Sequence, residues 1–268
     1  MNIPWEFLFW PMIACTVLVG IYAYFGMHVI SRGIIFVDLA LAQVAAVGAT
    51  VGLLLGFELG SPIAYLLSLA AALIGAAVFT FTRDLERKIP QEAIIGIVYA
   101  VSAAVGILLV SHEAEGTEHI RHLLVGSIIT VTPMEFFRIA LVSLLVGAFH
   151  LVCRSRFLAA TFGGRGELTN SAWWDFLFYA SFALVVTSSV HICGVLLVFV
   201  FLVVPSVFAA VLSDRVGLRL MHGWLFGLAG SVLGIALSFW FDTPTGATIA
   251  ATYGGMLLLF ALGRRLWM

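Results

Sequence analysis

Long apolar runs, separated by short polar stretches, follow one another along the whole chain. Runs of about 20 apolar residues are long enough to cross a bilayer as helices. The sequence contains nine of them, at residues 8–26, 34–56, 61–82, 93–111, 134–153, 173–189, 193–212, 223–241 and 246–263. Only a few residues separate the sixth run from the seventh near His191, so these two are either a tight hairpin or one broken segment. The pattern predicts an all-α polytopic membrane protein in which residues 1–268 form a single transmembrane domain.

The composition supports this prediction, and the placement of charge adds an orientation in the membrane. The chain is 62% hydrophobic and 10% charged, with a mean hydropathy of +1.13, whereas a soluble domain has about 25% charged residues. When the loops are assigned alternately to the two sides, eleven of the 13 lysines and arginines fall on one side, and only Arg121 and Arg138 fall on the other. Positive charge marks the cytoplasmic side. We therefore expect a multi-pass protein of the inner (plasma) membrane, with its N-terminus outside and its C-terminus in the cytoplasm.

The segment FVDLALAQVAAVG, residues 36–48, carries an ionisable side chain inside an apolar run. A carboxylate within a membrane helix is costly, and by default it is a functional group that faces the bundle or a water-filled cavity. Asp38 lies only six residues after Arg32, so pairing with Arg32 or capping of the helix start is an equal alternative. Gln43 makes either an interhelical hydrogen bond or a substrate contact. The same segment has a face of small residues that favours close helix packing: Ala45, Ala46, Gly48, Ala49 and Gly52.

Histidines gather in one predicted outer loop, SHEAEGTEHIRH, residues 111–122. Imidazole together with carboxylate suits zinc, manganese or iron, so His112, His119 and His122 are candidates for capturing a cation. A solvated acidic loop is the alternative. His191, near the same predicted side of the membrane, is a further candidate ligand.

The longest predicted cytoplasmic loop, residues 153–175, contains FLAATFGG, a mildly amphipathic stretch that ends in two glycines. It is expected to form a short helix on the inner membrane surface. That helix either receives a soluble partner or is drawn to anionic lipid by its positive charge. Motifs of hydrolases, intramembrane proteases, nucleotide-binding loops and haem attachment are missing from the sequence. We therefore expect a protein that is not an enzyme, and any use of ATP would need another subunit.

Five stretches, taken together and in order, resemble the membrane permease of ABC importers for zinc and manganese, the ABC type-3 permeases. These are SRGIIFVDLALAQVAAVG, QEAIIGIVYAVSAAVGILLV, HIRHLLVGSIITVT, VHICGVLLVFVFLVVPSVFAAVL and DTPTGATIAATYGGMLLLF. The resemblance covers nearly the whole chain. It implies ATP-driven import of a divalent metal ion, which would be the transported substrate rather than a bound cofactor.

The resemblance also implies partners and site residues. The partners are a cytoplasmic ABC ATPase, a second permease copy, an external metal-binding protein and membrane lipid, with no nucleic acid. A coupling helix for the ATPase would lie at residues 155–164, with Arg156, Ala159, Ala160 and Gly163 as contacts. Asp38 and Gln43 would line the metal path. A permease for a metal chelate or another small solute, and a membrane anchor without transport activity, are the alternatives.

The second apolar segment departs from the family pattern. The family has an aspartate four residues before a histidine there. Alignment on Gly48 puts Gln43 at the histidine position and Leu39 at the aspartate position, with Asp38 one residue earlier. A shift of one residue along a helix turns the side chain by about 100° around the helix axis. An amide is also a poorer zinc ligand than imidazole, so a harder ion or a chelate remains open.

Overall fold

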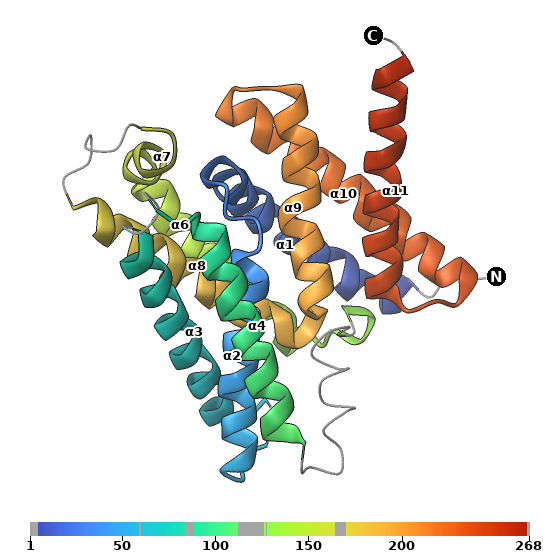
Figure 1. Ribbon diagram of the computed structural model, residues 1–268. Coiled ribbons are helices and arrows are strands. Elements are labelled where there is room, and N and C mark those ends of the chain that lie inside the picture. The colour runs from blue at the N-terminus through green and yellow to red at the C-terminus, as the bar shows by residue number, and fades with distance from the viewer. Residues whose placement is uncertain are drawn as a thin grey trace. The chain divides into compact units, whose positions relative to one another are not determined.

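The computed structural model, shown in Figure 1, describes residues 5–58, 60–83, 88–111, 126, 128–163 and 170–266. All regular secondary structure in this part of the chain is helical. The elements are α1 (Trp5–Arg32), α2 (Val37–Leu54), α3 (Pro62–Thr82), α4 (Gln91–Val110), the 3-10 turn η2 (Ile128–Thr130), α6 (Pro133–Val152), α7 (Arg154–Phe162), α8 (Ser171–Cys193), α9 (Val195–Leu212), α10 (Val216–Phe241) and α11 (Thr245–Leu266).

The predicted membrane spans are confirmed. Among the described residues, nine helices are long and apolar enough to cross a membrane, and each corresponds to one of the nine apolar runs. The sixth and seventh spans, α8 and α9, are separated by Gly194 alone, whose φ of +76° is a backbone conformation that other residues adopt with strain. His191 lies in the last turn of α8. The orientation of the termini stays a prediction.

Local sequence explains where several helices begin. At the start of α3, the Ser61 hydroxyl accepts a hydrogen bond from the Ala64 amide at 3.2 Å, and Pro62 occupies the first helical position. At the start of α6, Glu135 accepts from the Thr132 amide at 2.8 Å, while the Thr132 hydroxyl accepts from the Glu135 amide at 3.3 Å. This reciprocal pair is a capping box.

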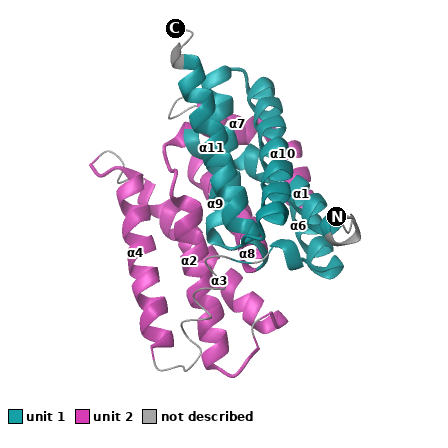
Figure 2. Cartoon of the chain, turned by 90° about the vertical axis from the view of Figure 1, so that its right-hand side faces the viewer, with its two compact units in different colours: residues 1–30, 124–143, 192–268 teal, residues 31–123, 144–191 magenta. Residues whose placement is uncertain are grey.

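The chain divides into two compact units, each assembled from segments that are distant in sequence (Figure 2). Unit 1 contains residues 1–30, 124–143 and 192–268, and unit 2 contains residues 31–123 and 144–191.

In unit 2, α2 packs against α3 and α4 through its small residues. A Cβ atom on Gly48 would lie 2.5 Å from the Leu67 carbonyl oxygen of α3. The Ser68 hydroxyl of α3 donates a hydrogen bond to the Ala45 carbonyl oxygen at 2.7 Å. Ala45, Gly48, Ala49 and Gly52 are buried, so the predicted close-packing face of this helix is confirmed.

In unit 1, α10 packs against α9 and α11. Four glycines follow one face of α10, namely Gly223, Gly227, Gly230 and Gly234. A Cβ on Gly230 would lie 2.7 Å from the Tyr253 ring of α11. The buried Tyr253 hydroxyl donates to the Gly227 carbonyl oxygen at 2.5 Å. This glycine face therefore lets the α11 tyrosine reach the backbone of α10.

Unit 1 also contains a close backbone approach at the break between α8 and α9. Gly126 has a φ of +57°. A Cβ atom placed on it would lie 2.2 Å from the Gly194 amide nitrogen and 2.6 Å from the Cys193 carbonyl oxygen. Cys193 is itself fully buried. Only glycine fits at position 126, because both its φ and its surroundings exclude a side chain.

Candidate functional site

Asp38 lies in the first turn of α2 and is 1% exposed. A short linker, Gly33–Phe36, leads into the helix from the end of α1. Neither Asp38 carboxylate oxygen accepts a hydrogen bond from any described residue, and the residue before the helix, Phe36, makes no side-chain capping bond. Burial of a carboxylate without partners is unfavourable, so among the described residues Asp38 is a buried acidic group without a hydrogen-bond partner at the start of α2.

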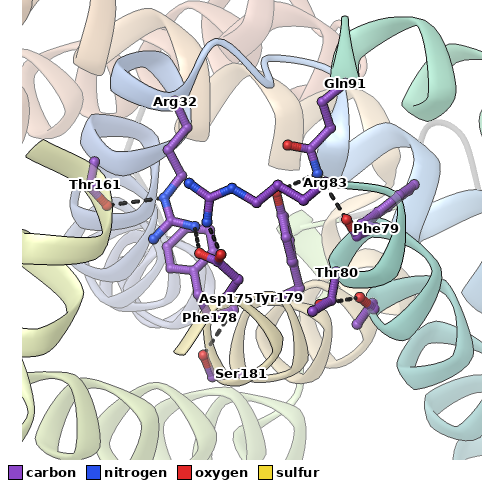
Figure 3. Close-up of polar contacts among 11 residues, drawn as sticks. Arg32, Phe79, Thr80, Arg83, Gln91, Thr161, Asp175, Phe178, Tyr179 and Ser181 are labelled. Atoms are coloured by element: carbon purple, nitrogen blue, oxygen red, sulfur yellow. Dashed lines mark hydrogen bonds and ion pairs between the residues drawn. The ribbon is translucent and has the colours of Figure 1, made fainter. Parts of the chain in front are cut away.

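Arg32, the basic residue nearest to Asp38 in sequence, binds another acid. Its Nη1 atom lies 3.0 Å from Oδ1 of Asp175 on α8, and the two side chains are 4% and 3% exposed. Arg83, just after α3, forms a second ion pair with Oδ2 of Asp175 (Figure 3). Capping and pairing with Arg32, the two structural roles considered for Asp38, are therefore not observed in the described part of the chain.

The buried Arg32 guanidinium also ties α7 to the other helices of unit 2. Its Nε atom donates to the Thr161 hydroxyl of α7 at 3.0 Å, and its central carbon lies 4.0 Å from the centroid of the Phe178 ring. Figure 3 shows Arg32 between Thr161 and Asp175, with the Phe178 ring beside it. One side chain at the end of α1 thus contacts both α7 and α8.

Two residues at the start of α4 make three further polar contacts that the sequence did not reveal. The buried Gln91 amide nitrogen donates to the Phe79 carbonyl oxygen and to the Tyr179 hydroxyl, each at 3.0 Å. The Glu92 carboxylate accepts a hydrogen bond from the Phe36 amide at 3.0 Å. Pro90 marks this helix start in the sequence, but no local pattern identifies partners so distant along the chain.

Gln43 is half-buried in α2, and it does not share the face of Asp38. Five residues along a helix correspond to a rotation of about 140°. His191 is also half-buried and lies 16 residues after Asp175 on α8, a rise of about 24 Å. Asp38 and Gln43 therefore lie on different faces of α2, and the roles of Asp38, Gln43 and His191 as metal ligands stay predictions.

The histidine loop of the sequence analysis, with His112, His119 and His122, lies outside the described residues. Within the described ranges, no three histidine, cysteine, aspartate or glutamate side chains lie close enough together to hold a metal ion. Capture of a cation by the histidine loop stays a prediction.

The short helix expected after the fifth span is present as α7. Among its predicted partner contacts, Arg156 and Gly163 are exposed, and Ala159 and Ala160 are half-buried. Gly163 ends the helix in an extended conformation.

An aromatic anchor fixes α7 to unit 2. The Phe157 ring is fully buried and stacks on the His150 ring of α6, with ring centroids 3.9 Å apart. The Trp174 ring of α8 contacts Phe157 edge-on at 5.6 Å. Phe162, at the other end of α7, is 46% exposed. One side of α7 is thus held by aromatic packing, while the other is open to a partner.

Nine apolar helices, with large apolar side chains such as Ile97, Leu108 and Leu144 exposed on their outer faces, define a multi-pass membrane protein. A family model described as "ABC 3 transport family" matches residues 4–263. The chain belongs to the ABC 3 transport family, so it is a membrane permease rather than an enzyme.

Relatives and a solved structure agree with this assignment. A "Probable metal transport system membrane protein" of Chlamydia trachomatis is 25% identical over 243 residues, covering 90% of this chain and 83% of the relative. "Manganese transport system membrane protein MntC" of Listeria innocua is 23% identical, covering 87% of this chain and 82% of the relative. PsaBC from Streptococcus pneumoniae superimposes with a TM-score of 0.78 at 20% identity, covering 96% of this chain and 91% of that chain. The predicted fold and family are thereby confirmed.

Proposed function

We propose that this chain is the membrane permease of an ATP-driven importer of divalent metal ions, with manganese or zinc as the cargo. The observation that carries the proposal is Asp38, a carboxylate that is buried inside a membrane helix without a partner among the described residues. Ionisable groups at such positions mark ion pathways in membrane proteins. Relatives named for metal and manganese transport support the same cargo class.

Of the two ions, the donors favour manganese. Asp38 offers carboxylate oxygens, and Gln43 offers an amide oxygen in place of the imidazole of the family pattern. Oxygen ligands suit manganese, whereas zinc is held more often by imidazole and thiolate. In this proposal Gln43 and His191 contact the ion before or after Asp38. The outer histidines His112, His119 and His122 are proposed to offer weak capture.

The remaining parts of the importer would be supplied by partners. In this proposal the α7 side of unit 2 faces the cytoplasm, in agreement with the distribution of arginine and lysine, and an ABC ATPase would bind there. A second copy of this chain would complete the pathway, and an external metal-binding protein would deliver the ion. ATP hydrolysis would then switch the permease between outward- and inward-facing states, in the inner membrane.

Asp38→Asn tests the cargo assignment. We expect uptake of radioactive manganese by cells to fall by at least about tenfold, the effect of losing about 1.4 kcal/mol of interaction. Stability should be unchanged or increased, because the substitution removes a buried charge and breaks no observed hydrogen bond. Uptake is measured separately with manganese, zinc and iron, and stability by thermal unfolding in detergent.

The matched control for this experiment is Asp214→Asn, the same substitution at a fully exposed residue. It should leave uptake and stability unchanged. Normal uptake of all three metals by the Asp38 variant would contradict the proposal, and uptake of a metal only as its chelate would replace the free ion with a chelate as the cargo.

The geometry of α7 supports its role as the ATPase coupling helix. Its exposed residues Arg154, Arg156 and Phe162 are available to a partner, while Thr161 holds Arg32 at the end of α1. The linker into α2 begins immediately after Arg32. A displacement of α7 would therefore act directly on the chain that leads to Asp38.

Phe162→Ala tests this coupling. Exposed aromatic side chains often contribute much of the energy of an interface, so we expect about a tenfold weaker association with the ATPase subunit. The measurement is the amount of ATPase that co-purifies with the permease, together with ATP turnover of the complex. Phe241→Ala removes another exposed phenylalanine, at the end of α10, and should have no effect. Equal loss in both variants would argue against α7 as the docking element.

A further inference from the structure

Three buried carboxylate oxygens lie near the starts of α2 and α4 without a hydrogen-bond donor among the described residues. They are Oδ1 and Oδ2 of Asp38 and Oε2 of Glu92. The other Glu92 oxygen accepts the bond from the Phe36 amide, two residues before Asp38. This bond joins the start of α4 to the residue that precedes α2, and the two helices pack against each other. The fold therefore brings the helix starts that carry Asp38 and Glu92 to one region of unit 2.

Among the described residues, neither Arg32 nor Arg83 pairs with these carboxylate oxygens. Arg32 and Arg83 both form ion pairs with Asp175. The positive end of the α2 dipole, with the Asp38 and Leu39 amides, lies near the Asp38 carboxylate, but no described group completes a hydrogen bond to either oxygen. A buried carboxylate that lacks a cation or a hydrogen bond is strongly unfavourable, so this charge is neutralised either by a proton or by a bound cation.

We infer that Asp38 and Glu92 are two ligands of one divalent-cation site, and that Glu92 is a specificity residue of the transport pathway. This inference rests on the proposed function and deepens it. Carboxylate oxygens at a site without imidazole or thiolate suit a hard ion such as manganese(II). Two protein ligands leave most coordination positions to water or backbone oxygens, which allows the ion to enter and leave.

Glu92 would have a second role besides binding the ion, because it also accepts the hydrogen bond from the Phe36 amide. Glu92 holds the linker before α2 with one oxygen and would hold the ion with the other. Binding of the ion would therefore connect the start of α4 to the first turn of α2, through the two carboxylates and through the linker. A site built in this way would form and break as the two helix starts move.

Glu92→Gln is the decisive variant, because glutamine keeps an oxygen that accepts from the Phe36 amide but removes the charge. Manganese(II) binding is measured on the purified full-length chain in lipid nanodiscs, by electron paramagnetic resonance of the free ion. We expect one ion per wild-type chain. Glu92→Gln and Asp38→Asn should each weaken binding at least tenfold. The double variant should bind no more weakly than the poorer single variant, because both residues belong to one site.

Glu58→Gln is the matched control, since Glu58 is exposed and described in the same unit. It should bind manganese as the wild type does. If Glu92→Gln reduces folded yield, Asp38→Asn decides the outcome, because it disturbs no observed hydrogen bond.

Unchanged manganese binding in either Glu92→Gln or Asp38→Asn overturns the inference. That result is also expected if the two carboxylates share a proton instead of an ion. The proposed function would survive it as long as cells still lose metal uptake with Asp38→Asn. Normal uptake of every metal by that variant would instead contradict the proposed function itself, so the two failures are distinguishable.

Discussion

Asp175→Asn is expected to lower the free energy of unfolding by about 3–5 kcal/mol, the cost of breaking a buried ion pair by removing one partner. Asp175 is 3% exposed and lies between Arg32 and Arg83. Without its charge, the Arg32 and Arg83 guanidinium groups both lose their ion pair with Asp175. For a chain of this size, such a loss lowers the melting temperature by roughly 10 °C. Thermal unfolding of the purified protein in detergent measures the effect.

Asp214→Asn is the matched comparison, because it removes the same charge from an exposed ion pair with Arg219. Exposed pairs contribute little to stability, so its melting temperature should equal that of the wild type. Adding Arg83→Gln to Asp175→Asn should restore part of the lost stability, since it removes one of the two positive charges that Asp175 neutralises in the wild type. Equal melting temperatures for the Asp175 and Asp214 variants would show that the buried cluster does not stabilise unit 2.

Gly26→Ala is expected to destabilise unit 1 by about 3 kcal/mol, the upper range for inserting a methyl group into a packed core. A Cβ atom at this position would lie 2.0 Å from the Leu202 carbonyl oxygen and 2.2 Å from the Ser206 hydroxyl oxygen of α9. The obstacle at Leu202 is backbone, so α1 and α9 would have to separate. The Ser206 hydroxyl would also lose its bond to the Ala23 carbonyl oxygen, now at 3.4 Å.

Gly20→Ala provides the control within the same helix, because no atom lies within 4 Å of a Cβ placed at Gly20. Alanine is favoured over glycine in a helix interior by about 0.5–1 kcal/mol, so this variant should be as stable as the wild type or slightly more stable. Thermal unfolding and the fraction of monodisperse protein after size-exclusion chromatography compare the two variants. A Gly26 variant as stable as the Gly20 variant would contradict the close helix contact.

Much of the fold could be predicted from the sequence because each helix that crosses a membrane must by itself contain about 20 mostly apolar residues. The apolar runs located all nine spans, and the small residues of the second run indicated its packing face against α3. The helix after the fifth span could also be predicted, from FLAATFGG. These features depend on residues that are neighbours in the chain, where periodicity and composition are visible.

Contacts between distant segments could not be predicted in the same way. Arg32 was considered a partner of Asp38 because six residues separate them, yet it binds Asp175, 143 residues away. The bond between Glu92 and the Phe36 amide, and the glycine face of α10, also became visible only in three dimensions. A single sequence shows which residues inside a membrane span are polar. It does not show which of the other spans each polar side chain faces.

The close approach of Gly126 to the Cys193–Gly194 peptide has a consequence for biosynthesis. Backbone that leaves the helical pattern between two membrane helices needs protein or water around its polar groups, and Gly126 lies directly against this peptide. The ribosome makes Gly126 before it makes the helix break. The residue that covers this peptide is therefore already part of the chain when the break between α8 and α9 is synthesised.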